Sequence, residues 1–201
     1  IHDQKSSGRC WMFSGFNVLR ANFAKQHNDT ITVEFSHAYL FFYDQLEKAN
    51  LMLQGVIDNA SKPLEDTRMQ FFFKNPINDG GTFCGVADLA EKYGLVPMSV
   101  MPETYSSNNT RLMARMVASK LREYGLELRS MVHAGKNKRT IETRKTEMLS
   151  TIYNILSMTI GKPVEQFTYA FKNKEGKTVT PLKTYTPVSY THLTLPTTPY
   201  V

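Results

Sequence analysis

The strongest constraint on the fold of this chain is the spacing of its apolar residues, which recur every three or four positions over long stretches. In the first stretch, Met12, Phe16 and Leu19 follow one another at this spacing, which places them on one face of an α-helix. The same pattern predicts helices over residues 10–25, 37–50, 66–74, 85–93, about 111–124 and about 139–160. A chain with this pattern must fold mainly by packing helices against one another.

The two longest helical patterns follow an irregular connection over residues 97–109, and they end before Gly125 and Gly161. We expect them to form an antiparallel helical pair. Further along, residues 167–172 and 178–184 are typical of two strands on either side of a hairpin turn. The pattern therefore predicts an α+β protein with its helices first and its strands last.

Composition excludes several classes of protein. The chain contains no run of eighteen apolar residues, so we expect no membrane-spanning segment and no membrane partner. It has only two cysteines, Cys10 and Cys84, which are too few for a disulfide framework or a CxxC zinc site. This cysteine usage favours a reducing compartment such as the cytoplasm. We expect Cys84 to be a buried small apolar residue or one that is merely tolerated.

Charge is distributed unevenly along the chain. Residues 1–110 carry a net charge of −3, whereas residues 111–201 carry a net charge of +9. Much of the positive charge falls in a basic stretch formed by Lys136, Lys138, Arg139, Arg144 and Lys145. A solvated helix face is the first interpretation of this stretch. Contact with nucleic acid is the alternative, although no aromatic residue is interleaved for stacking on bases.

The last fourteen residues, 188–201, have an unusual composition. They contain no charged residue and show neither helical nor strand periodicity. The segment resembles the end of a sequencing adapter translated as coding sequence. We therefore expect the genuine coding sequence to end near Pro187, and residues 188–201, including His192, to take no part in the fold. A natural extension rich in Thr and Pro is the alternative.

The segment Gln4-Lys-Ser-Ser-Gly-Arg-Cys-Trp11 combines residue types that activate a thiol. A helix that begins at Cys10 places the sulfur at a helix N-terminus, where the dipole lowers the pKa of the thiol. The Cys10 N–H then has no intrahelical partner and can donate to an oxyanion, with the side-chain amide of Gln4 as a second donor. Gly8 lets the backbone pass close to a substrate, and Trp11 can exclude water. Together these residues predict a cysteine nucleophile.

At this spacing the segment resembles the active-site signature of papain-like cysteine peptidases, in which Gln precedes the nucleophilic Cys by six positions and an aromatic residue follows it. Ser7 stands where secreted members have a cysteine that forms a disulfide. This departure makes the segment similar to the intracellular branch, that of bleomycin hydrolase and aminopeptidase C. The stretches 35–50, 91–97 and 101–104 look like the same branch, in the same order.

The resemblance implies a fold and a division of the chain. Residues 1–110 would form the helical half of a papain-like cysteine peptidase fold and carry the nucleophile. Residues 111–162 would form a helical-hairpin insertion that separates this branch from papain itself. Residues 163–187 would be the opening strands of the β-rich half.

The resemblance also assigns roles to further residues. Asp79, Gly80 and Gly81 are similar to the glycine pair whose backbone holds the substrate beside the S2 pocket in this family. The catalytic His and Asn of the family lie in the second half of the papain-like fold, and they are expected to be absent from this chain. His133 is followed by Ala, as catalytic histidines of this type often are, but it lies between the two insertion helices. His37 is expected to face solvent from its helix.

The function that the resemblance implies is a cysteine-type aminopeptidase that acts on peptides without a metal or an organic cofactor. The complete enzyme would be a cytoplasmic homohexamer, and the 201-residue chain would be inactive alone because it lacks the imidazole. One alternative is a papain-type endopeptidase, against which Ser7 and the helical insertion argue. The other is a basic nucleic-acid-binding protein that uses residues 136–145, since hexamers of the family have a basic lumen and some bind DNA.

Overall fold

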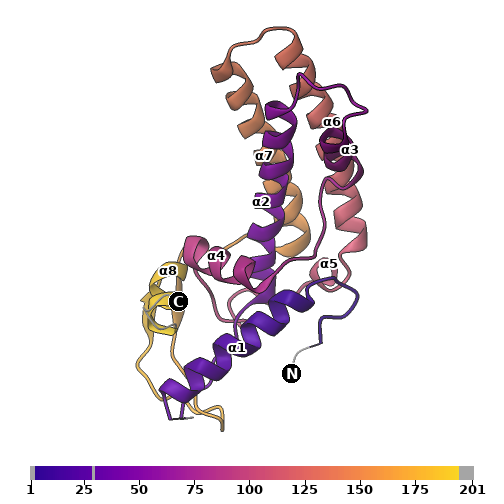
Figure 1. The fold of residues 1–201 in the computed structure, drawn as a ribbon. Helices are drawn as coiled ribbons and strands as arrows, with labels where there is room; N and C mark the ends of the chain where they lie inside the picture. The colour runs from indigo at the N-terminus through magenta and orange to yellow at the C-terminus, as the bar shows by residue number, and fades with distance from the viewer. Residues whose placement is uncertain (1–2, 29, 195–201) are drawn as a thin grey trace.

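The computed structural model describes residues 3–28 and 30–194. Its elements are α1 (Cys10–Gln26), α2 (His37–Asp58), α3 (Thr67–Lys74), α4 (Phe83–Tyr93), α5 (Tyr105–Asn108), α6 (Arg111–His133), α7 (Lys138–Ile160), β1 (Phe167–Tyr169), β2 (Lys183–Tyr185) and α8 (Pro187–Thr194). Figure 1 shows a long arm, in which α2, α6 and α7 run along one another, and a base that includes α1, α4 and α8. No described helix is long and apolar enough to cross a membrane.

Side-chain caps explain where several helices begin. The Ser36 side chain accepts a hydrogen bond from the N–H of Tyr39, so the predicted start of α2 is confirmed. Thr82 caps α4 in the same way, and Asn137 caps α7. At the other end of α4, Gly94 has a φ of 77°, a conformation that few residues besides glycine adopt. These helix ends follow from local chemistry, whereas α2 corrects its predicted end at residue 50 because it continues to Asp58.

The arm is held together by an apolar seam. Helix α2 contacts both α6 and α7, and these two contact each other. Val117 and Leu121 of α6 and Ile152 and Leu156 of α7 are fully buried in this seam. Burying one such side chain stabilises the fold by roughly 1.5–3 kcal/mol. The predicted antiparallel pair is therefore present, and Figure 1 shows the chain reversing between α6 and α7 at the far end of the arm.

Gly125 does not end a helix, which corrects the prediction that the first long pattern stops there. Helix α6 continues to His133. A Cβ atom at Gly125 would lie 3.1 Å from the ring of Phe73 and 3.2 Å from the side chain of Met52. The glycine is needed where α2 and α3 pack closely on α6, so tertiary contact rather than helix termination explains it.

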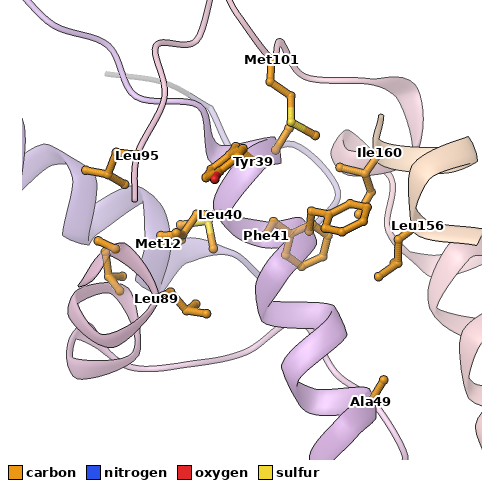
Figure 2. Packing of buried hydrophobic residues seen from close by; sticks show 14 of the residues in the cluster. Met12, Tyr39, Leu40, Phe41, Ala49, Leu89, Leu95, Met101, Leu156 and Ile160 are labelled. Carbon is orange, nitrogen blue, oxygen red and sulfur yellow. The ribbon is translucent and has the colours of Figure 1, made fainter. Parts of the chain in front are cut away.

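The base has its own part of the core, which Figure 2 shows around the N-terminal end of α2. All six residues from His37 to Phe42 are buried, so this end of the helix is surrounded by protein. Met12 and Phe16 of α1 pack into the same cluster, and Leu89 joins it from α4. This packing fixes α1, and with it the residue at its N-terminus, against α2 and α4.

The strands are present but shorter than predicted. β1 and β2 pair in antiparallel register, with Phe167 opposite Tyr185. Between them lie only isolated bridges such as Lys172 with Thr178. Gly176 has a φ of 80° in the connecting turn, which agrees with the predicted hairpin. The α+β class is as the sequence predicts, although the helix α8 follows the small sheet.

The segment after Pro187 corrects one expectation. Residues Pro187–Thr194 form α8, and Tyr190 is fully buried, with ring centroids 5.7 Å from Phe171 and 6.5 Å from Phe35. Helix α8 also contacts α4. The expectation that this segment takes no part in the fold is therefore wrong up to Thr194, because one aromatic side chain anchors it without any apolar periodicity. Residues 195–201 lie outside the described residues.

Candidate active site

Cys10 is the first residue of α1, and it is exposed. The carbonyl oxygen of Arg9 accepts hydrogen bonds from the N–H groups of Met12 (3.0 Å) and Phe13 (3.1 Å), which begins the helix. No side chain caps this end of α1. The Cys10 N–H belongs to the first turn and therefore has no intrahelical partner. The predicted start of a 17-residue helix at the thiol is confirmed.

Gln4 lies in a loop closed on itself just before Cys10. Its side-chain amide donates to the carbonyl oxygen of Ser7 at 2.9 Å, and the Ser7 hydroxyl donates back to the carbonyl oxygen of Gln4 at 2.7 Å. The first bond uses one of the two amide hydrogens and fixes the orientation of the amide. Among residues 3–28 and 30–194, the second hydrogen has no acceptor. Its use toward an oxyanion stays a prediction.

The carboxylate of Asp79 ties this loop to the glycine turn at residues 78–81. One of its oxygens accepts from the N–H of Gly8 at 2.6 Å and from the hydroxyl of Thr110 at 2.7 Å. Partial burial raises the pKa of Asp79, but these two bonds, together with a bond from its own backbone and the charge of Lys48, leave the pKa below its ordinary value. The side chain of Asp79 is thus occupied in holding the loop, a role that the sequence did not predict.

Two glycines make this contact fit. A Cβ atom at Gly8 would lie 2.6 Å from a carboxylate oxygen of Asp79, and one at Gly81 would lie 2.6 Å from the ring of Trp11. The Trp11 indole N–H also donates to the carbonyl oxygen of Asp79 at 2.8 Å. Glycine is therefore required on both sides of the contact, because any side chain would push the loop and the turn apart. The predicted contact of Gly8 with a substrate is a separate matter and stays a prediction.

Helix α2 holds the turn from the other side through residues that sequence reasoning missed. The ammonium of Lys48 donates to the carbonyl oxygen of Gly80 (2.6 Å), to that of Asn78 (3.0 Å) and to the carboxylate of Asp44 (2.8 Å). Gln45 donates to Asn78 as well, at 2.9 Å. Burial raises the pKa of Asp44, although Lys48 and Gln45 lower it in part. The mostly polar run from Asp44 to Lys48, which directly follows the apolar start of α2, was the available signal.

The comparisons with known proteins identify the family. Residues 1–195 match the Peptidase C1-like family. The chain belongs to this family. It is 39% identical over 176 residues to aminopeptidase C of Lactobacillus delbrueckii subsp. lactis, and 38% identical over 192 residues to bleomycin hydrolase of Homo sapiens. These matches cover 88% and 92% of this chain.

A solved structure of the same kind supports the peptidase C1-like fold. The crystal structure of PepW from Lactobacillus rhamnosis HN001 superposes with a TM-score of 0.87 at 34% identity, over 94% of this chain. The fold class predicted from the sequence is therefore confirmed. The chain spans only 39% of the aminopeptidase C, and 42% of both the bleomycin hydrolase and PepW. The chain is therefore shorter than half the length of each of these proteins.

Two histidines of this peptidase C1-like chain, His37 and His133, contact groups other than the thiol. His37 is buried and stacks on Phe13 at 3.8 Å between ring centroids, so the expectation that it faces solvent is wrong. The reason is that α2 is buried on all sides at its first turn. His133 contacts the carbonyl oxygen of Ala60 at the far end of α6, at 2.6 Å, as expected for a residue between the long helices. His2 lies outside the described residues.

Cys84 provides a useful contrast with Cys10. It lies in the first turn of α4 and is exposed, so the expectation of burial is wrong and tolerance is the interpretation that is left. Both thiols are therefore accessible near helix N-termini. The loop of Gln4 and Ser7 directly precedes Cys10 in the sequence, and the carboxylate of Asp79 anchors this loop through the N–H of Gly8, which distinguishes Cys10 from Cys84.

Proposed function

We propose that this chain carries the nucleophile of a cysteine-type aminopeptidase, which hydrolyses N-terminal peptide bonds in the manner of bleomycin hydrolase. The observation that carries the proposal is the exposed Cys10 at the N-terminus of α1, beside a loop and a glycine turn that are fixed to each other. Relatives named aminopeptidase C and bleomycin hydrolase support the choice of activity. A papain-type endopeptidase is the alternative within the same chemistry.

In the proposed reaction, the Cys10 thiolate forms a bond to the carbonyl carbon of the substrate, and the carbonyl electrons move onto oxygen. The Cys10 N–H and the second amide hydrogen of Gln4 stabilise this oxyanion. An imidazole outside the described residues takes the thiol proton and gives it to the amine as the C–N bond breaks. Water then attacks the thioester, which breaks the C–S bond and restores the thiol.

The substrate backbone would be held mainly by Gly81. Gly80 is already engaged, because its N–H donates to the side chain of Asn78 and its carbonyl oxygen accepts from Lys48. Within residues 3–28 and 30–194, no partner takes the backbone groups of Gly81. We therefore propose that Asp79 and Gly80 shape the turn and that Gly81 pairs with the substrate. Trp11 packs under the same residue.

The basic stretch gives weaker support to the nucleic-acid alternative. Arg144 pairs with Glu127 and Glu147, and Lys145 pairs with Glu142, so two of its five charges are balanced locally. Its remaining members lie exposed at the turn between α6 and α7. We keep a cytoplasmic homohexamer with weak nucleic-acid affinity as a proposal for the complete enzyme, supported by the resemblance alone.

Chemical labelling tests the nucleophile directly. The 201-residue chain would be treated with a peptidyl chloromethyl ketone, and the adducts at Cys10 and Cys84 would be quantified by mass spectrometry. We expect at least tenfold preference for Cys10, lost in the Cys10→Ser variant, with Cys84 as the internal control. Equal labelling of both thiols would contradict the proposal. Labelling as fast as that of a complete papain-like enzyme would instead place a functional imidazole in this chain.

A further inference from the structure

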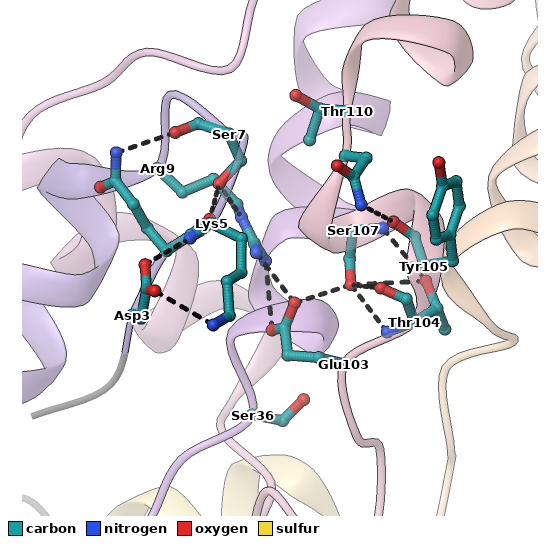
Figure 3. A network of polar contacts seen from close by, with 12 residues as sticks. Asp3, Lys5, Ser7, Arg9, Ser36, Glu103, Thr104, Tyr105, Ser107 and Thr110 are labelled. Carbon is teal, nitrogen blue, oxygen red and sulfur yellow. Dashed lines mark hydrogen bonds and ion pairs between the residues drawn. The ribbon is translucent and has the colours of Figure 1, made fainter.

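The residue before the nucleophile is a buried arginine. Arg9 is 0% exposed, and its guanidinium donates to both carboxylate oxygens of Glu103, at 3.1 and 2.8 Å. The same group lies 5.3 Å from the ring centroid of Phe13 and 5.1 Å from that of Phe41. Arginine suits this position because its planar fork matches a carboxylate and its faces pack on aromatic rings. Figure 3 shows this pair between the loop of Ser7 and the segment of Ser107.

The Nε–H of the guanidinium, which does not contact Glu103, connects the ion pair to the loop. The Arg9 Nε–H donates to the hydroxyl oxygen of Ser7 at 3.0 Å. Because arginine is always protonated, Ser7 must accept this bond and use its own hydrogen elsewhere. It donates to the carbonyl oxygen of Gln4, and the Gln4 amide donates to the carbonyl oxygen of Ser7. The relay therefore runs from Glu103 through Arg9 and the Ser7 hydroxyl to the backbone of Gln4, and the Gln4 amide closes it on the backbone of Ser7.

The acidic end of the relay is also held in place. The hydroxyl of Ser107 donates to Glu103 at 2.6 Å. Ser107 belongs to α5, which Thr104 caps, and the Thr104 hydroxyl donates to the carbonyl oxygen of Thr159 near the end of α7 at 2.8 Å. The relay is therefore anchored to two helices that lie outside the loop itself.

We propose that Arg9 is a positioning residue, which acts through Ser7 to aim the free amide hydrogen of Gln4 at the oxyanion formed on Cys10. The inference rests on the proposed function. A buried ion pair contributes little more to stability than apolar residues of the same volume, so its distinct effect is the directed contact with Ser7. Ser7 stands where secreted papain-like enzymes have a disulfide cysteine, and the relay gives the loop a non-covalent restraint there.

The test separates oxyanion binding from thiol reactivity in the 201-residue chain. A peptide aldehyde forms a tetrahedral adduct with Cys10 that bears an oxygen in the predicted site, whereas iodoacetamide alkylates the thiol without one. The measured quantities are the dissociation constant of the aldehyde, the alkylation rate at Cys10 and the urea midpoint. The variants are Arg9→Lys, Ser7→Ala and the double variant Arg9→Met/Glu103→Leu. Arg129→Met is the control, since Arg129 holds the Ala60 carbonyl oxygen far from the site.

We expect all three variants to bind the aldehyde about tenfold or more weakly, as loss of an oxyanion donor does in other enzymes. Their alkylation rates at Cys10 should stay within about twofold, and the double variant should unfold near the native midpoint because no charge is left unpaired. The control should change neither binding nor alkylation. If the double variant or Ser7→Ala binds the aldehyde like the native chain, Arg9 has a structural role only and the inference is wrong.

Failure of the proposed function would give different results in the same binding measurements. If Cys10 is not the nucleophile, the native chain itself forms no aldehyde adduct that depends on Cys10. If Gln4 is not an oxyanion donor, Gln4→Ala binds the aldehyde as tightly as the native chain. An adduct that needs Cys10 and Gln4 but is indifferent to Arg9 and Ser7 would overturn the relay and leave the proposed function standing.

Discussion

Removing the carboxylate of Asp79 tests whether the nucleophile loop depends on the glycine turn. In Asp79→Ala, the N–H of Gly8 and the hydroxyl of Thr110 lose their common acceptor. The bond from Trp11 to the backbone oxygen of Asp79 is left in place. The substitution therefore cuts one of two connections between the loop and the turn, and it does so without touching Cys10.

The size of the effect follows from the two bonds. A hydrogen bond to a charged group contributes about 1.5–3 kcal/mol, and partial exposure of Asp79 reduces this, so we expect a loss of about 2–4 kcal/mol for both together. Asp79→Asn can offer one neutral oxygen to the same two donors and should lose about 1 kcal/mol. With a urea m-value of about 2 kcal/mol/M, the alanine variant shifts the midpoint by about 1–2 M.

The pH dependence gives the sharper result. Because the pKa of Asp79 is lower in the folded state than its ordinary value, its contribution is present above the ordinary pKa and is lost as pH falls through the folded pKa. The difference between the native chain and Asp79→Ala should therefore shrink when urea titrations move from about pH 6 toward pH 3. Asp88→Ala, on the exposed face of α4, is the matched control. A loss below about 0.5 kcal/mol, or one that is equal at both pH values, would refute the reasoning.

Two further substitutions address the turn itself. Gly81→Ala should destabilise the fold by about 1–3 kcal/mol, because the new Cβ would lie 2.6 Å from the ring of Trp11. It should also alter the fluorescence of Trp11, the sole tryptophan. Gly85→Ala is the control, since its Cβ would lie 3.5 Å from the same ring and should be tolerated; equal urea midpoints for the two variants would contradict the prediction. Lys48→Met should cost about 2–4 kcal/mol at neutral pH, since it leaves Asp44 buried without its cation. Because burial already raises the pKa of Asp44, that cost should fall as pH drops and Asp44 is protonated; a cost independent of pH in urea titrations would argue against the ion pair.

The sequence predicted most of the helices because their signals are local. Ser36 and Gly94 mark helix ends by side-chain and backbone chemistry that needs no distant partner. Gly125 was misinterpreted because its cause is tertiary: the rings and side chains that pack on it come from α2 and α3. The prediction that His37 faces solvent was wrong for the same reason, since only the assembled base buries every face of the first turn of α2.

In the candidate site, too, the local features were predicted from the sequence and the long-range contacts were not. Cys10 was predicted from a short segment, because a helix N-terminus is a property of neighbouring residues. The long-range partners were not predicted: Asp79 contacts Gly8 across 71 positions, and Glu103 contacts Arg9 across 94. Nothing in the local pattern around Asp79 or Glu103 distinguishes a carboxylate that binds the loop from one that faces solvent.

These long-range contacts explain how the surroundings of the thiol are held in place. The nucleophile loop is restrained by Asp79 on one side and by the Arg9–Glu103 pair on the other, and Lys48 holds the turn from α2. All three restraints are charged groups that meet backbone or side-chain partners from different elements, so each fixes a direction as well as a distance. The geometry around Cys10 is therefore set by the helical part of the fold. In the proposed reaction, the imidazole would take the proton from a thiol whose surroundings are already in place.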